Sequence, residues 1–257
     1  MTAPLLSIIT VVRNDAAGLA RTVASLAQTA ADPAIECLLV DGASTDGTVA
    51  VARGFYPAER MVSEPDRGIY DAMNKGLRRA RGRYGLWLNG GDTLVPGAAA
   101  RLVAHLETAT ADVVGFGTVV SSPDGAFPSY TWHGSAAAFA RGALPHPSTA
   151  IARGRALRLG GYDERWPIAA DRDLMLRLHR DGATYLAVDA AVAAFTTGGV
   201  SSTPRAWLED IRLHRAHRLI GPWEAGVRYL KYLALRVPGV APALHARSHR
   251  RAGYLSR

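Results

Sequence analysis

The chain has 257 residues, of which 48% are hydrophobic and 20% are charged, so it is long enough to bury a core and too apolar for an intrinsically disordered chain. Its single cysteine excludes an intrachain disulfide scaffold, and no uncharged apolar run approaches the roughly 20 residues of a membrane-spanning helix. The N-terminus lacks the pattern of a secretory signal, and we therefore expect a cytoplasmic protein.

The net charge of +8 is concentrated at one end of the chain. Residues 203–257 contain 11 Lys and Arg against 3 Asp and Glu, together with four of the eight histidines. Residues 1–202 contain 19 cationic and 19 acidic side chains. A basic segment attracts anionic surfaces such as membrane lipid, nucleic acid or an acidic partner. We expect residues 203–257 to form a basic C-terminal extension of a neutral domain.

The first 120 residues alternate between strand and helix signals. Continuous apolar runs predict buried strands, whereas apolar residues three or four positions apart predict helices. Strands are expected at 5–12, 37–40, 60–63, 84–88 and 113–120, and helices around 19–26, 44–51, 69–77 and 98–106. This alternation predicts an α/β fold with a doubly wound, mainly parallel sheet flanked by helices.

The second half is less regular. We expect a loop at 121–135, strands near 148–152, 185 and 192–196, and a helix over about 171–180. The basic extension is predicted to be helical, with a break at Pro222 and an end near Pro238. In the first half, Asn14 or Asp15 is expected to cap the first helix, and Ser44 or Thr45 the second.

Polar clusters follow the predicted strands, at the edge where open α/β sheets bind ligands. They are 13–15, 41–42, 63–67 and 89–92. Asp41 and Asp92 would converge on one crevice, where one carboxylate accepts a hydrogen bond from a base or ribose and the other holds Mg²⁺ or Mn²⁺. The alternative is that both belong to ordinary Asp-Gly and Gly-Asp turns, and both interpretations stay open.

A helix with several charges opens in residues 64–76. Arg67 stands near its N-terminus, where the helix dipole would help it to grip a diphosphate. The alternative is that Asp66 caps the helix and Arg67 is solvated.

Three segments resemble glycosyltransferase family 2 when they are taken together. They are SIITVVRN at 7–14, VDGASTDGT at 40–48 and DRGIYDAMNKG at 66–76. Members of that family have the nucleotide-sugar-binding GT-A fold and invert the anomeric centre. DRGIYDAMNKG, with LNGGD at 88–92 and GGVSS at 198–202, looks most similar to members that build bacterial colanic-acid-type, capsular and other surface polysaccharides.

The resemblance spans residues 5–202 and implies the domain organisation. A GT-A domain would occupy 1–202, with a nucleotide-sugar-binding half at 1–120 and an acceptor and catalytic half at 121–202. The basic extension at 203–257 lies outside it.

The resemblance also implies residue roles. Nucleotide-sugar binding would fall to Thr10, Val12, Arg13, Asp41, Arg67 and Asn89. Residues 89–92 stand where the family has its metal-binding Asp-x-Asp, and here only Asp92 keeps an acid. A single carboxylate with two donor phosphates can still hold Mn²⁺ or Mg²⁺ as the cofactor, with water filling the other positions.

Asp171 matches the position of the family's Asp that deprotonates the acceptor hydroxyl. From the residues alone, Asp171 tops an apolar helical stripe and would point inward, unless it merely caps the helix. Asp173, with Arg177 one turn further on, is predicted to form a surface ion pair. His146 is the second catalytic candidate, and its alternative is an ordinary loop residue. Gly160 to Asp163, which precedes this helix, also fits a simple helix stop and turn.

The resemblance to this family implies an inverting glycosyltransferase of the hexosyltransferase type. It would move a sugar from a nucleoside-diphosphate sugar to a hydroxyl of a lipid-linked or oligosaccharide acceptor in surface polysaccharide biosynthesis. Aromatic and basic residues in 203–257 predict peripheral binding to the anionic inner face of the cell membrane, with a helix packed on the domain as the alternative. No nucleic-acid partner is expected.

Two other functions stay open. A sugar-phosphate nucleotidylyltransferase would need a Gly-rich basic loop after the first strand, which residues 12–16 lack. A non-catalytic adaptor on a degenerate transferase fold is favoured by the loss of acids at 89–91. A dinucleotide-dependent dehydrogenase is disfavoured because no G-x-G-x-x-G follows the first strand.

Overall fold

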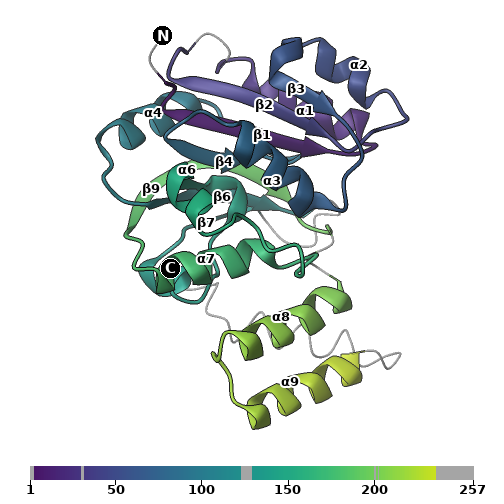
Figure 1. Cartoon of the computed structure of the whole chain (residues 1–257), viewed down its shortest axis with the longest axis vertical. Coiled ribbons are helices and arrows are strands. Elements are labelled where there is room, and N and C mark those ends of the chain that lie inside the picture. Colours follow the sequence, from purple (N-terminus) through teal and green to yellow (C-terminus); the bar gives the residue numbers. More distant parts are fainter. Residues whose placement is uncertain (1–2, 30–31, 123–128, 200, 202, 236–257) are drawn as a thin grey trace. The chain divides into compact units, whose positions relative to one another are not determined.

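The computed structural model describes residues 3–29, 32–122, 129–199, 201 and 203–235 (Figure 1). The chain divides into two units, Met1–Thr197 and Gly198–Arg257, and each is described by itself. The boundary between the two units, after Thr197, lies close to the predicted domain boundary at 202. The separate functions expected of 1–120, 121–202 and 203–257 stay predictions.

The described residues of the first unit form one 9-stranded sheet. The strand order is β3-β2-β1-β4-β8-β6-β9-β5, and β7 pairs with β6. The strands are β1 (Leu6–Val12), β2 (Ile35–Asp41), β3 (Met61–Ser63), β4 (Tyr84–Trp87), β5 (Thr93–Leu94), β6 (Val113–Ser121), β7 (Tyr130–Trp132), β8 (Thr149–Ala152) and β9 (Tyr185–Thr196).

The half of the sheet that contains β3, β2, β1 and β4 is entirely parallel. All seven residues of β1 are buried, as its continuous apolar run predicts. The register sets Val12 beside Asp41 and Asp41 beside Ser63. The three strands therefore end level with one another, and the loops that follow them start from the same edge.

The other half of the sheet mixes strand directions. β8 runs antiparallel to β4 and β6, whereas β6 and β9 are parallel. The two strands expected near 185 and 192–196 are one strand, β9, whose pairing with β6 shifts register around Gly117. The expected loop at 121–135 contains β7, so that prediction is wrong there, and residues 123–128 lie outside the described residues.

Helices cover both faces of the sheet. They are α1 (Ala16–Leu26), α2 (Thr48–Arg53), α3 (Ile69–Arg79), α4 (Ala98–Thr108), α5 (Ala136–Phe139), α6 (Arg153–Arg158) and α7 (Ala170–Arg180). Ile8 and Ile9 of β1 belong to different hydrophobic clusters, because successive strand residues point to opposite faces. One cluster includes residues of α1 and α4, and the other includes residues of α3 and α7.

The two predicted helix caps have different outcomes. Asp15 caps α1, and its carboxylate accepts a hydrogen bond of 2.8 Å from the Gly18 amide. The N-cap of α2 is Gly47, which makes no side-chain cap bond. The prediction of Ser44 or Thr45 as that cap is wrong because both residues make hydrogen bonds within the preceding loop, which the site below describes.

The second unit contains two described helices, α8 (Pro204–Ala216) and α9 (Pro222–Leu235). Thr203 caps α8 by accepting a hydrogen bond from the Ala206 amide. The predicted break at Pro222 is confirmed, and the predicted end near Pro238 lies outside the described residues. Within the described ranges, none of the helices combines the length and the apolar composition that crossing a membrane requires.

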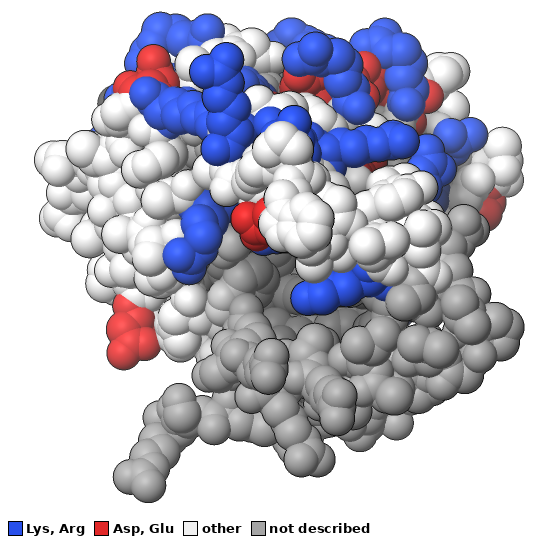
Figure 2. All heavy atoms as spheres, turned by 90° about the horizontal axis from the view of Figure 1, so that it is seen from below, with Lys and Arg blue, Asp and Glu red and all other residues white. Residues whose placement is uncertain are grey.

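Cationic and acidic side chains are interspersed on the first unit. Figure 2 shows Lys and Arg gathered along one side of the face, with Asp and Glu among them. Arg155 illustrates the pairing, because it lies 2.9 Å from both Asp112 and Asp181. Mixed signs weaken the one-sign field that attracts nucleic acid. The expected lack of a nucleic-acid partner stays a prediction.

Candidate active site

The loops that follow β1, β2 and β3 are joined at the carboxyl edge of the sheet. The Asn14 amide donates a hydrogen bond of 2.7 Å to Ser44 Oγ, and the Thr45 amide donates one of 2.8 Å to Asn14 Oδ1. A Cβ atom on Gly42 would lie 2.2 Å from Asp66 Oδ2 and 3.2 Å from Arg13 Cδ. Three of the polar clusters predicted from the sequence therefore form one surface.

Asp41 fixes the centre of this surface. Its side chain is fully buried, and its carboxylate accepts hydrogen bonds from the Ser44 amide at 3.0 Å, from Ser44 Oγ at 2.5 Å and from Ser63 Oγ at 2.5 Å. Three donors hold the two oxygens in place, which leaves the carboxylate rigid at the strand end. Asp41 thus ties the β2 loop to β3.

The other predicted nucleotide-binding residues of β1 lie differently. Val12 ends the strand and is almost buried, and Arg13 is exposed beside Gly42. Thr10 is fully buried, and its Oγ1 accepts a hydrogen bond of 3.1 Å from the Tyr56 hydroxyl. The structure therefore brings Val12 and Arg13 to the loop edge and keeps the hydroxyl of Thr10 in the interior.

The turn at 89–92 is held against β1 and α1. Thr22 Oγ1 accepts a hydrogen bond from the Gly91 amide at 3.0 Å and donates one to the Asp92 carbonyl oxygen at 2.8 Å. Gly91 has a φ of 97°, which favours glycine, and a Cβ on Gly90 would lie 2.8 Å from Val12 Cγ2. The glycine pair therefore lets the turn pass close to the end of β1.

Two side chains of this turn, those of Asn89 and Asp92, carry oxygen atoms of the kind that divalent cations prefer. Asn89 Oδ1 is buried and has no hydrogen-bond partner among the described residues, which is costly for an acceptor. Burial raises the pKa of the Asp92 carboxyl to about 7, with a hydrogen bond at the Asn89 backbone opposing that rise. Carbonyl and carboxylate oxygens are the ligands that Mg²⁺ and Mn²⁺ prefer.

A cation here would need further ligands. Among the described residues, no group of three or more His, Cys, Asp or Glu side chains is arranged to hold a metal. Asp92 and Asn89 could supply two protein oxygens, and phosphate oxygens and water would complete the coordination, as is usual for Mg²⁺.

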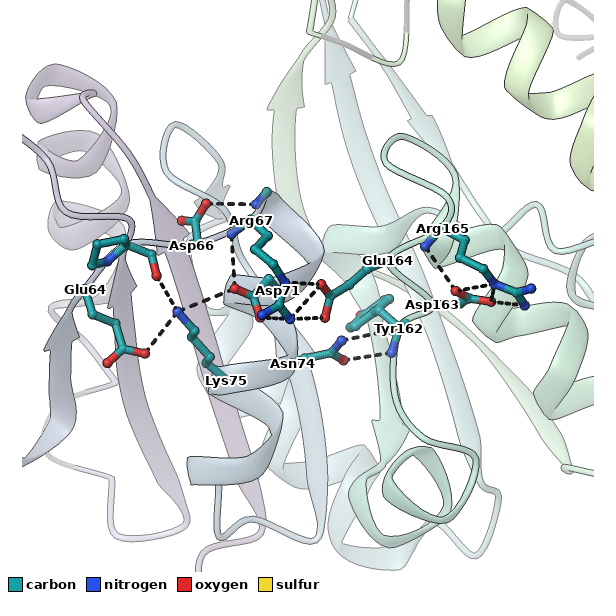
Figure 3. Close-up of polar contacts among 12 residues, drawn as sticks. Glu64, Asp66, Arg67, Asp71, Asn74, Lys75, Tyr162, Asp163, Glu164 and Arg165 are labelled. Carbon is teal, nitrogen blue, oxygen red and sulfur yellow. Dashed lines mark hydrogen bonds and ion pairs between the residues drawn. The ribbon is translucent and has the colours of Figure 1, made fainter.

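Arg67 belongs to a chain of ion pairs that crosses from α3 to the loop before α7 (Figure 3). Its guanidinium lies 3.0 Å from Asp71 and 2.9 Å from Glu164, and Lys75 lies 3.0 Å from Glu64. The Arg67 side chain is 75% exposed, as the alternative of a solvated residue expects, and it also pairs with two carboxylates. The alternative of Asp66 as helix cap is wrong, because α3 begins after Gly68 without a side-chain cap.

Asn74 joins the same two segments inside the protein. Its Nδ2 donates a hydrogen bond to the Tyr162 carbonyl, and its Oδ1 accepts one from the Tyr162 amide, each at 2.8 Å (Figure 3). Gly161 has a φ of 71°, and a Cβ there would lie 2.4 Å from Asn74 Oδ1. The sequence 160–163 therefore forms the predicted turn, and this turn is clamped to α3.

The clamp places Tyr162 in an aromatic cluster. Its ring centroid lies 5.3 Å from that of Tyr70 and 5.2 Å from that of Trp87. Sequence reasoning did not single out these three residues. The available signal was the apolar spacing of α3, but Ile69, which opens that helix, is exposed, whereas Tyr70 is buried.

The two predicted catalytic residues, Asp171 and His146, line one small pocket beside this aromatic cluster. The side chains around it are Trp87, Leu144, His146, Thr149, Ile151, Tyr162, Asp171 and Met175. The residues come from β4, from the segment around β8, from the turn at 160–163 and from α7. The structure thus brings together two residues that are 25 positions apart in sequence, and their roles stay predictions.

The two carboxylate oxygens of Asp171 differ in their hydrogen bonds. Oδ1 accepts a hydrogen bond of 2.8 Å from the Arg172 amide and lies 3.1 Å from the Tyr70 hydroxyl, whose single proton it shares with the Ile168 carbonyl oxygen at 2.8 Å. No described residue donates a hydrogen bond to Oδ2. Burial and the neighbouring Asp171 raise the pKa of Tyr70 well above its usual range, so Tyr70 stays a neutral donor. A carboxylate anchored through one oxygen can accept a proton at the other.

His146 is half-buried in a short turn rather than fully exposed on a loop. It starts a 3₁₀ turn that leads into β8, and its Nε2 is buried without a hydrogen-bond partner among the described residues. Burial lowers the pKa of His146, with the nearby Asp171 opposing that effect. The imidazole is therefore neutral at physiological pH.

The predicted ion pair of Asp173 with Arg177 is confirmed, but its predicted place at the surface is wrong, because Asp173 lies in the interior. Its side chain is 4% exposed, and its carboxylate lies 2.6 Å from Arg177 Nε. Arg177 also donates hydrogen bonds to the carbonyl oxygens of Leu159 at 2.8 Å and Gly161 at 2.6 Å. The segment 159–161 covers this side of α7, and the helical pattern gives no sign of that cover.

Comparisons with known proteins agree with this geometry. A family model described as "Glycosyl transferase family 2" matches residues 7–160. An uncharacterized glycosyltransferase of Mycobacterium tuberculosis is 33% identical over 233 residues, which are 84% of this chain and 86% of the relative. A PGL/p-HBAD biosynthesis glycosyltransferase of Mycobacterium bovis is 33% identical over 216 residues, which are 79% of this chain and 81% of the relative.

Solved structures confirm the fold. TarS of Staphylococcus aureus, in complex with UDP-GlcNAc, aligns with a TM-score of 0.65 at 17% identity, over 90% of this chain and 72% of that one. The mannosyltransferase PcManGT of Pyrobaculum calidifontis, in complex with GDP-Man and Mn²⁺, aligns with a TM-score of 0.61 at 18% identity, over 100% of this chain and 77% of that one. The GT-A-like α/β architecture predicted from the sequence is confirmed.

Proposed function

The chain belongs to glycosyl transferase family 2, and we propose that it transfers a hexose-type sugar, with inversion, from a nucleoside-diphosphate sugar to an acceptor hydroxyl. The observation that carries this proposal is the state of Asp171. One of its oxygens is anchored by Tyr70, and the other has no partner among the described residues, in a pocket that also contains His146. Such a carboxylate is suited to act as a general base.

The donor would bind at the joined loops after β1, β2, β3 and β4. UDP, UDP-GlcNAc and GDP-Man are bound by the structural neighbours, and ligands bind at this edge of open α/β sheets. Asp41, whose buried carboxylate is held by Ser44 and Ser63, would line the nucleoside pocket by fixing the β2 loop, and the exposed Arg13 would reach the phosphates. Thr10 would shape the pocket from beneath rather than through its hydroxyl.

A transfer step needs a base and a stabilised leaving group. Asp171 would take the proton of the acceptor hydroxyl at Oδ2. A divalent cation, when held by Asp92 and Asn89, would neutralise charge on the leaving diphosphate. Arg67 is a second candidate for that diphosphate, and binding it would require Arg67 to exchange Asp71 or Glu164 for a phosphate.

The acceptor is proposed to be lipid-linked or an oligosaccharide, in the synthesis of surface polysaccharide or glycolipid. One relative is named for PGL/p-HBAD biosynthesis, which supports a glycolipid or polysaccharide setting. The colanic-acid or capsular subtype belongs to the same proposal. We place the protein in the cytoplasm, at the inner face of the membrane.

A thermal-shift screen tests donor binding. A ligand that binds only the folded state at 100 times its Kd stabilises it by about 2.7 kcal/mol, or roughly 5–10 °C for a domain of this size. We expect one nucleoside diphosphate among UDP, GDP, dTDP and CDP to raise Tm in this range when Mn²⁺ is present, and by less without it. A nucleotidylyltransferase would respond to the triphosphate and the sugar phosphate instead, and an adaptor to none of these ligands.

The second unit presents an apolar stripe that suits a bilayer surface. Trp223 and Leu230, which are 85% and 65% exposed, lie two helical turns apart on α9, and Leu233 is also exposed. The segment from 203 onward carries the whole excess of positive charge. Apolar and basic residues together are typical of helices that lie in the interface of anionic membranes.

We therefore expect the full chain to co-sediment with vesicles that contain phosphatidylglycerol, and to be released by high salt. Replacing both Trp223 and Leu230 by alanine should abolish most binding, whereas Leu186→Ala, at an exposed apolar residue of β9, should not. Equal binding to neutral phosphatidylcholine vesicles, or none to anionic ones, would contradict the membrane proposal.

A further inference from the structure

The pocket between Asp171 and His146 has room for a single small group. Its free volume is about 10 Å³, which is close to the space that one water molecule or one hydroxyl requires. Most of its wall is apolar and comes from Trp87, Leu144, Ile151 and Met175. A group that enters it can therefore make polar contacts only with the few polar side chains of the wall.

Besides the hydroxyls of Thr149 and Tyr162, the wall offers one carboxylate oxygen and one ring nitrogen. Asp171 Oδ2 has no described partner, and His146 Nε2 is buried and unpartnered. The Thr149 hydroxyl already donates to the Pro145 carbonyl oxygen at 2.7 Å. An unsatisfied buried ring nitrogen costs free energy. A ligand that contacts it recovers that free energy.

We propose that this pocket holds the reacting hydroxyl of the acceptor, and that His146 Nε2–H donates a hydrogen bond to its oxygen while Asp171 Oδ2 takes its proton. This inference rests on the proposed function and adds a role for His146. The neutral imidazole carries one ring proton, and with that proton on Nε2 the residue acts as a donor and not as a base.

The step then balances at every atom. The O–H bond of the acceptor breaks, and its proton passes to Asp171. One lone pair of that oxygen accepts the hydrogen bond from His146, and the other forms the bond to the anomeric carbon. The bond between that carbon and the diphosphate oxygen breaks, and its electron pair leaves with the diphosphate. His146 thus fixes the direction of the attacking lone pair, which is an effect of orientation.

Water serves as the acceptor in the test, because the pocket fits one water molecule. The assay measures nucleoside diphosphate released by hydrolysis of whichever of UDP-glucose, UDP-GlcNAc, GDP-mannose and dTDP-sugars the wild type turns over. His146→Leu removes the hydrogen-bond donor and should lower kcat by about 10–100-fold, where each tenfold change corresponds to about 1.4 kcal/mol. The KM for the nucleotide sugar should stay unchanged.

Two further variants separate orientation from structure. His146→Gln places an amide N–H near the position of Nε2 and should retain kcat within about threefold to fivefold of the wild type. His146→Asn is too short and should behave like His146→Leu, which keeps the test valid if the leucine variant fails to fold. His105→Leu replaces a histidine of α4 whose ring lies 6.0 Å from that of Phe116, outside the pocket, and is the matched control.

The outcomes distinguish this inference from the proposed function. Wild-type kcat in both His146→Leu and His146→Asn would overturn the role of His146, while a loss of hydrolysis in Asp171→Asn would still support the base. An unchanged kcat with a raised KM would also overturn the role of His146, because His146 would then bind the nucleotide sugar instead. Wild-type hydrolysis by Asp171→Asn would instead overturn the proposed function itself.

Discussion

Asp171→Asn is expected to lower turnover by about 10²–10⁴-fold, the usual scale for loss of a general base, while folding and nucleotide binding persist. The asparagine keeps an oxygen that can accept the hydrogen bonds from Tyr70 and the Arg172 amide. Its amide nitrogen cannot take a proton from the acceptor. Steady-state release of nucleoside diphosphate measures the loss, and the nucleotide-induced shift in Tm checks that the donor still binds.

Asp173→Asn is the matched control, since the residue lies on the same helix two positions further on. Asp173 faces Arg177 in the interior and not the pocket. Its replacement should lower the free energy of unfolding by about 1–3 kcal/mol and leave kcat of the folded protein near that of the wild type. Normal turnover in Asp171→Asn, or an inactive but folded Asp173→Asn, would show that the base is assigned to the wrong residue.

The second large effect is expected at the 89–92 turn. Asp92→Ala should remove most sugar transfer and most of the Mn²⁺-dependent affinity for nucleoside diphosphate, because no second acid in the turn replaces the lost carboxylate. Asn89 Oδ1 alone is a neutral ligand and attracts the cation less strongly. Isothermal titration of the nucleoside diphosphate with and without Mn²⁺ measures this independently of activity.

The stability of the Asp92 variant separates metal binding from folding. An ionised carboxylate that is buried without a cationic partner costs free energy, so alanine at this position is not expected to lower Tm in the absence of metal. Asp181→Ala removes a partly exposed carboxylate that pairs with Arg155 and should leave Mn²⁺-dependent binding unchanged. Undiminished Mn²⁺-dependent binding in Asp92→Ala would exclude Asp92 as a metal ligand.

The parallel half of the sheet and its loop edge could be predicted from the sequence because their signals are local. The apolar run of β1 is long enough to indicate a strand buried on both faces, and polar residues stop it at Arg13. Once strand and helix alternate, the rule for parallel sheets places the loops after β1, β2 and β4 at one edge. That reasoning correctly joined Asp41 to the neighbouring loops.

The surroundings of the candidate site depend on contacts between segments that are distant in sequence, and the periodicity of apolar residues does not encode such contacts. Asn74 clamps the backbone of Tyr162, 88 residues away, and Arg67 reaches Glu164 across 97 residues. The helical pattern gave the inward direction of Asp171 but not the segment that covers Asp173. The short helices α5 and α6 have four and six residues, too few to produce a clear periodic signal.

The most direct measurement is release of nucleoside diphosphate from a panel of nucleotide sugars by the purified full chain with Mn²⁺, with Asp171→Asn in parallel. We expect the wild type to release the diphosphate from one class of nucleotide sugar at a slow but steady rate, and the variant to release it at least about 100-fold more slowly. Equal rates for the two proteins, or no release from any nucleotide sugar that raises Tm, would contradict a glycosyl transfer that depends on Asp171.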